Sequence, residues 1–130
     1  MEILILEGTP KTPTIEFKPG EGYLLLRGRS IPENSIEFYK PLIEGLDAYN
    51  SNPQSKTTVD IQLEYFNTSS SKCVLDVLKK LEAINGNSEV IINWYYEEDD
   101  EDMKEVGEDF ACMVNLPFEF ISKQVESPFS

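Results

Sequence analysis

The sequence predicts an α/β fold with a mixed sheet, an N-terminal antiparallel hairpin and about three helices. Segments that alternate apolar and polar residues, as half-buried strands do, take turns with segments whose apolar residues recur at helical spacing. Turn-forming residues separate most of these segments. Strands that alternate with helices favour a sheet that is at least partly parallel, with right-handed crossovers between its strands.

The N-terminal part of the chain predicts strands. Residues 3–6 form a short apolar run, and residues 14–18 alternate in the pattern of a half-buried strand. Residues 18–22 contain Pro-Gly turn chemistry and match neither a phosphate-binding loop nor a dinucleotide fingerprint. Residues 23–29 follow as another strand, so we expect a hairpin here.

The first helix is expected to begin near Phe38 or to kink there. Residues 31–35 offer N-cap candidates, and residues 50–53 close the segment. Pro41 is unfavourable in a helix interior because it lacks an N–H group. The helical stripe itself consists of Tyr39, Leu42, Ile43, Leu46 and Tyr49.

The rest of the chain predicts three strands that alternate with two helices. The strands are expected at residues 57–66, 89–96 and 117–121. The helices are expected from Ser69 to about Ile84, with a stop at residues 85–87, and around the stripe Met103, Val106, Phe110 and Met113. We expect a single domain over residues 1–126. Residues 125–130 look like a loose tail, and the short tail outside the domain is placed at 127–130.

Charge and hydropathy exclude several classes of function. Acidic residues outnumber basic ones 24 to 11, which gives a formal net charge of −13 and makes nucleic acid and anionic membranes poor partners. The charge either attracts a basic protein partner or only maintains solubility. No apolar run is long enough to span a membrane, and the N-terminus reads as a strand, not a signal peptide, so we expect a cytoplasmic protein.

The sequence also contains few of the residues that usually serve catalysis or metal binding. The chain has no histidine, which removes the commonest general base and the commonest zinc ligand. Cys73 and Cys112 fall in predicted helices and read as small buried residues. We therefore expect no catalytic residue, no metal site and no cofactor. The acidic stretch 97–109 lacks the spacing of a calcium loop; it is either a solvated helix start or a docking site for a basic partner.

Alternation places Trp94 and Tyr96 on one sheet face and Tyr95 on the other, mainly as core.

A different kind of segment joins the strand 57–66 to the next helix. It consists of Asn67, Thr68, Ser69, Ser70, Ser71 and Lys72. One or two hydroxyls would suffice to cap a helix, and four are present. A phosphate is tolerated at a helix N-terminus, and the edge where strands end is where open α/β sheets usually bind ligands. The segment reads as a cap or as a phosphorylation switch.

The stretch 65–72, with residues 60–64 before it, resembles the signature of the bacterial SiaC-type regulatory phosphoproteins. Further similarity lies at residues 8–13, 28–33 and 93–96 with the acidic run that follows. The resemblance implies a STAS-like fold akin to anti-sigma-factor antagonists such as SpoIIAA. It also implies partner switching: a kinase of the histidine-kinase-like ATPase type phosphorylates Thr68, and a PP2C-type phosphatase reverses this. The unmodified form engages an effector such as a diguanylate cyclase. Asn67 stands where the classical antagonists carry Asp.

Three hypotheses follow from the sequence. The first is a non-enzymatic, phosphorylation-controlled interaction module, with Thr68 as acceptor and a smooth serine-rich docking surface around it. The second is a constitutive acidic adaptor without a switch. The third is a small enzyme that uses carboxylates of the acidic stretch as an acid–base pair.

Overall fold

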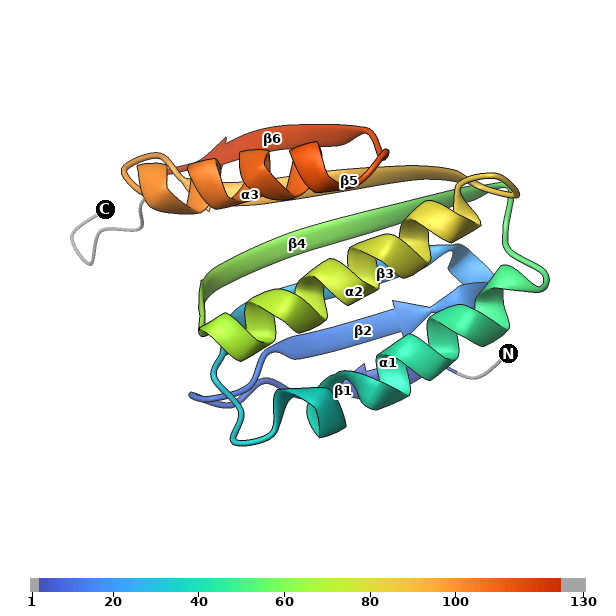
Figure 1. Cartoon of the computed structure of the whole chain (residues 1–130), viewed down its shortest axis with the longest axis horizontal. Helices are drawn as coiled ribbons and strands as arrows, with labels where there is room; N and C mark the ends of the chain where they lie inside the picture. The colour runs from blue at the N-terminus through green and yellow to red at the C-terminus, as the bar shows by residue number, and fades with distance from the viewer. Residues whose placement is uncertain (1–2, 125–130) are drawn as a thin grey trace.

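The computed structural model describes residues 3–124 and contains one six-stranded sheet covered by three helices on one face (Figure 1). The strands occur in the spatial order β1-β2-β3-β4-β5-β6. The elements are β1 (Leu4–Leu6), β2 (Thr14–Lys18), the 3-10 turn η1 (Pro19–Glu21), β3 (Tyr23–Ser30), α1 (Ser35–Asn50), β4 (Lys56–Phe66), α2 (Thr68–Ile84), β5 (Glu89–Glu97), α3 (Glu101–Met113) and β6 (Phe118–Lys123).

The sheet is antiparallel at its N-terminal end and parallel elsewhere. Strands β1, β2 and β3 pair antiparallel, and β3 to β6 pair parallel. Right-handed crossovers that all advance in one direction put every connecting helix on the same face, as Figure 1 shows. The predicted α/β fold with a mixed sheet, an N-terminal hairpin and three helices is confirmed. Because the strand order never reverses, this sheet has no topological switch point, and no ligand crevice of that kind exists in it.

The core lies between the sheet and the helical layer. Along β4 the alternation of the sequence puts Val59, Ile61 and Leu63 inside, against buried residues of α1 and α2. The opposite sheet face carries polar and charged side chains together with a few apolar ones such as Leu25. There the Tyr23 hydroxyl donates to Asp60 at 2.8 Å, and the Asn93 amide donates to the same carboxylate at 2.9 Å. The sheet is therefore covered on one side only, which explains the clear period of two.

The start of α1 differs from the prediction. The helix begins at Ser35 and runs through Pro41. Pro41 removes one backbone hydrogen bond, but Asn34 caps the helix by accepting from the Glu37 N–H at 3.2 Å. The apolar stripe, with Tyr39 and Leu42 almost fully buried, then holds the helix against the sheet. Tertiary packing outweighs the local cost of the proline.

Three smaller outcomes concern the cysteines, the C-terminal tail and membrane-spanning helices. Cys73 is buried as predicted, but Cys112 is exposed, because it lies on the solvent side of the last turn of α3. The predicted tail at residues 125–130, including residues 127–130, lies outside the described residues. In the part of the chain that the structure describes, no helix is long and apolar enough to cross a membrane.

Candidate functional site

The hydroxyl-rich segment forms the first turn of α2, where β4 ends. Asn67 is the N-cap: its Oδ1 accepts from the Ser70 backbone N–H at 2.8 Å and from the Ser69 hydroxyl at 3.1 Å. The Asn67 N–H donates to the Ser30 carbonyl at 3.2 Å, which ties the turn to the end of β3. The helix start is therefore fixed by Asn67, and Thr68 is its first residue.

The four hydroxyls of this turn lie in different environments. Ser70 is fully buried and accepts a hydrogen bond from Ser30 Oγ at 2.8 Å. Ser69 is exposed but engaged by Ser35 Oγ at 2.8 Å, and Ser71 is half-buried. Thr68 is exposed, and no hydrogen bond among the described residues involves its hydroxyl. The sequence predicts a docking surface over the whole turn, but the side chain of Ser70 faces inward and adds no exposed surface to it.

The N-termini of α1 and α2 meet at this site. Ser35 is the first residue of α1, and its hydroxyl lies 2.8 Å from Ser69 Oγ and 3.3 Å from Ser70 Oγ. Each helix start carries free N–H groups and about half a positive charge. Lys72, one turn into α2, is exposed and adds a formal positive charge. The site therefore favours an anion on a protein that is otherwise strongly acidic.

Three residues of this network were not expected at the site from the sequence: Ser30, Ser35 and Tyr39. Ser30 is fully buried and lies 2.7 Å from the Tyr39 hydroxyl, so the network continues from α2 through β3 into α1. The bonds from Ser30 and Ser35 to α2 span 40 and 34 residues of sequence. No local spacing signals such pairs, because they form only when the crossover brings both helix starts to one edge of the sheet.

Substitutions at the buried and capping residues of this network should lower the stability of the protein, whereas a substitution at the exposed Thr68 should not. We expect Ser70→Ala to lower the free energy of unfolding by about 1–2 kcal/mol, because it leaves Ser30 Oγ without its acceptor. Asn67→Ala should cost about 1 kcal/mol through loss of the cap, whereas Asn67→Asp should retain it. Thr68→Ala should stay within about 0.5 kcal/mol. Urea unfolding of the four variants measures these differences. A large loss for Thr68→Ala would contradict the placement of its hydroxyl.

The buried phenol of Tyr39 makes stability depend on alkaline pH. Burial raises its pKa from 10.0 to about 12, although the Ser30 hydrogen bond acts in the opposite direction. Because the folded-state pKa is the higher one, this contribution is complete below the unfolded pKa of 10.0 and is lost as pH rises toward about 12. Tyr39→Phe should therefore flatten the fall of unfolding free energy over that range. Equal slopes for both proteins, measured by denaturant unfolding, would contradict this.

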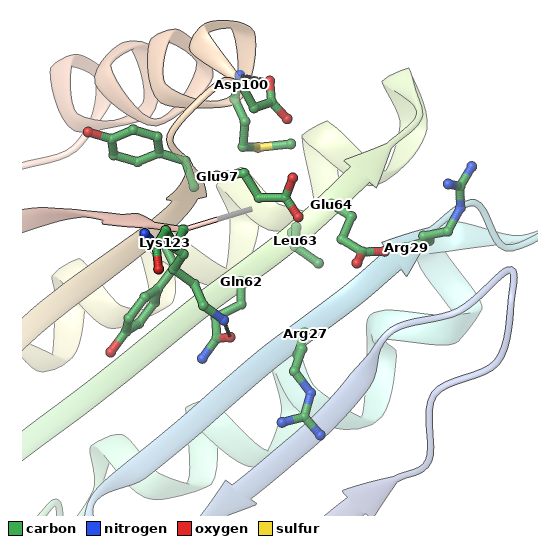
Figure 2. A pocket seen from close by; sticks show the side chains of 12 residues that line it. Arg27, Arg29, Gln62, Leu63, Glu64, Glu97, Asp100 and Lys123 are labelled. Carbon is green, nitrogen blue, oxygen red and sulfur yellow. Dashed lines mark hydrogen bonds between the residues drawn. The ribbon is translucent and has the colours of Figure 1, made fainter. Parts of the chain in front are cut away.

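A separate hollow of about 470 Å³ lies where β3 to β6 end (Figure 2). Its lining mixes both signs of charge, with Arg27, Arg29 and Lys123 opposite Glu64 and Glu97. The Lys123 ammonium donates to Gln62 Oε1 at 3.1 Å. Thr68 does not line this hollow, so the predicted site and the hollow are different places.

The other predicted residues have structural places. Trp94 is fully buried and Tyr96 half-buried on the helix side of β5, and Tyr95 faces the other side, near Lys123. Burial and the carboxylates of Asp60 and Glu119 raise the pKa of Tyr95. Within the acidic stretch, Asp100 caps α3 by accepting from the Met103 N–H at 3.0 Å.

The structure is a one-sided α/β sheet with an exposed threonine hydroxyl at a helix N-terminus, and its class follows from comparison with known proteins. The model of the SiaC family of regulatory phosphoproteins matches residues 6–123, and the chain belongs to this family. An uncharacterized protein of Pseudomonas aeruginosa strain UCBPP-PA14 is 34% identical over 119 residues, covering 91% of this chain and 94% of that protein.

Solved structures of the same family have the same fold as this chain. SiaC of Pseudomonas aeruginosa is 32% identical with a TM-score of 0.85, over 95% of this chain and 100% of that one. A chain in the crystal structure of the diguanylate cyclase SiaD in complex with its activator SiaC is 33% identical with a TM-score of 0.86, over 92% of this chain and 99% of that one. The resemblance read from the sequence is thereby confirmed at the level of family and fold.

Proposed function

We propose that Thr68 is the phosphoacceptor of this regulatory phosphoprotein and that its modification controls binding to an effector. In this proposal the unmodified chain binds and activates a diguanylate cyclase. A kinase of the histidine-kinase-like ATPase type adds the phosphate, and a PP2C-type phosphatase removes it. The SiaD–SiaC complex supports the choice of effector, since the related SiaC is the activator of a cyclase there.

The observation that carries the proposal is the contrast among the four hydroxyls. A kinase must reach its acceptor and take up the hydroxyl proton. Thr68 is exposed and unengaged among the described residues, whereas Ser70 is buried and Ser69 is bonded to Asn67 and Ser35. Accessibility and freedom from hydrogen bonds therefore coincide at Thr68.

The surroundings favour a phosphate at this position. It would add about −1.5 to −2 charges at the start of α2, where the N–H groups and the dipole stabilise an anion. Lys72 lies four residues on and is exposed, within reach of the same helix face. We infer that phosphorylation leaves the fold intact and acts on whatever surface meets Thr68. This suits a reversible switch.

Mapping the modified residue tests the assignment. The chain is incubated with its kinase and ATP, and phosphopeptides are located by mass spectrometry. We expect labelling at Thr68, loss of labelling in Thr68→Val, and unchanged labelling in the matched control Ser71→Ala. A PP2C-type phosphatase should remove the label. Labelling that persists in Thr68→Val would overturn the proposal.

The alternative is a constitutive adaptor, whose binding to the effector does not depend on the state of Thr68. Effector recovery in a pull-down is compared for wild type, Thr68→Ala and Thr68→Asp. The switch predicts that Thr68→Asp recovers less effector than Thr68→Ala, because only the former adds negative charge. Equal recovery by all three, together with equal recovery by the phosphorylated chain, would favour the adaptor.

A further inference from the structure

A groove of about 510 Å³ runs between α1 and α2 and is lined only by side chains of these two helices. Tyr39 and Cys73 lie buried at its floor, and Ile43 is half-buried. Ile36, at the start of α1, has 77% of its surface exposed, the largest value among the exposed hydrophobic residues. A large apolar side chain that is exposed to solvent beside an apolar groove indicates a binding surface.

The charge around this groove differs from that of the chain as a whole. Lys40, Lys79 and Lys80 line it, against Asp76 as the acidic lining residue, although the chain carries a net charge of −13. The Lys80 ammonium is held by Asp47 at 2.8 Å. Among the described residues, Lys40 and Lys79 form no ion pair and are exposed. The groove therefore offers free cationic groups beside an apolar floor.

Its length along α2 suits a helix. From Cys73 to Ala83 the groove follows α2 for about 15 Å, or close to three turns of helix. A helix that lies in such a groove places apolar side chains at positions i, i+3 or i+4, and i+7 into it. The residues that flank this stripe would meet Lys40 and Lys79, so complementarity requires them to be acidic.

One end of the groove adjoins the site at Thr68. Ile36 follows Ser35, whose hydroxyl lies 2.8 Å from Ser69 Oγ, and Ser69 follows Thr68. A phosphate there would add negative charge at the end of a surface suited to an acidic segment. This explains why the unmodified form, and not the phosphorylated one, would retain its partner.

We propose that the α1–α2 groove binds an acidic amphipathic helix of the effector, with Ile36 as an apolar contact and Lys40 and Lys79 as charge partners. The identity of the occupant as the effector rests on the function proposed above. The chemistry of the groove does not, because it follows from the side chains that line it.

The test uses two synthetic helical peptides of equal length with the same leucine stripe, flanked by glutamates in one and by lysines in the other. Their affinities for the whole chain are measured by fluorescence anisotropy. We expect the glutamate peptide to bind about tenfold more tightly or better, with a preference that salt weakens. The double variant Lys40→Glu/Lys79→Glu should reverse the preference. The matched double variant Lys11→Glu/Lys104→Glu, at exposed lysines outside the groove, should keep it.

Several outcomes would overturn the groove assignment. These are equal affinity for both peptides, no binding of either, or a reversal by the control double variant as large as that of the groove variant. Self-association of the chain that Ile36→Asp abolishes would instead identify a second copy as the occupant. If the peptides fail while phosphorylation of Thr68 still releases the effector, only the groove assignment fails. If the peptides behave as expected but Thr68 is not the acceptor, only the proposed switch fails.

Discussion

Phosphorylation of Thr68 is expected to weaken binding of the effector by about a hundredfold, or about 3 kcal/mol. The reason is electrostatic. A phosphate of about −1.5 to −2 charges at an interface built around an unmodified threonine must either remain desolvated without a partner or keep its water and prevent close contact. The exposed position of Thr68, at the first residue of α2, allows the phosphate to reach the partner directly.

The measurement is an affinity titration of the proposed effector, a diguanylate cyclase, with chain that carries phosphothreonine at position 68. Thr68→Val is the matched control, because it keeps the shape of the side chain and removes the acceptor. It should bind within a few-fold of wild type and should not respond to the kinase. An affinity that the phosphate leaves unchanged would show that the first turn of α2 is outside the interface.

Gly107→Ala is expected to destabilise the protein by about 2–3 kcal/mol. Gly107 lies in α3 against the indole of Trp94, and a Cβ there would lie 2.5 Å from Trp94 Nε1 and 2.6 Å from Cδ1. The indole cannot move aside easily. It is fully buried, packs against Phe110 at 5.7 Å between centroids, and donates its N–H to the Met103 carbonyl at 3.0 Å. Overpacking should exceed the gain of about 1 kcal/mol in helix propensity.

Gly45→Ala is the matched control for that substitution. Gly45 is also a glycine inside a helix, but a Cβ there would meet only the Phe17 ring at 3.4 Å, an ordinary contact. We expect this variant to be neutral or slightly stabilised. The double variant Gly107→Ala/Trp94→Leu should be less unstable than the sum of its single variants, because the smaller side chain relieves the overlap. Thermal unfolding of wild type, the three single variants and the double variant measures these differences. Equal stability of both alanine variants would contradict close packing at Gly107.

How far the sequence determines the structure differs from element to element. The strand β4 was predictable because one face of the sheet is bare, so that Val59, Ile61 and Leu63 alternate cleanly with polar residues. The start of α1 was not, because Pro41 is a local signal whereas the packing that overrides it comes from residues far along the chain. The exposure of Cys112 similarly depends on how the last turn of α3 faces solvent.

The same distinction applies to the site. The spacing of residues 67–72 indicated a helix start with surplus hydroxyls, and the structure bears this out with Asn67 as the cap. Spacing alone could not separate the hydroxyls, since burial of Ser70 is decided by Ser30 on another strand. The groove between α1 and α2 could not be read from the sequence either, because Ile36 and Lys79 are brought to one surface only by the packing of their helices.

The most direct test of the switch is the activity of the proposed effector, a diguanylate cyclase, measured with the unmodified chain and again after the chain has been phosphorylated at Thr68. We expect the unmodified chain to raise the rate of cyclic dinucleotide synthesis, the phosphorylated chain not to do so, and phosphatase treatment to restore activation. Equal activation by the unmodified and phosphorylated chains would contradict this expectation.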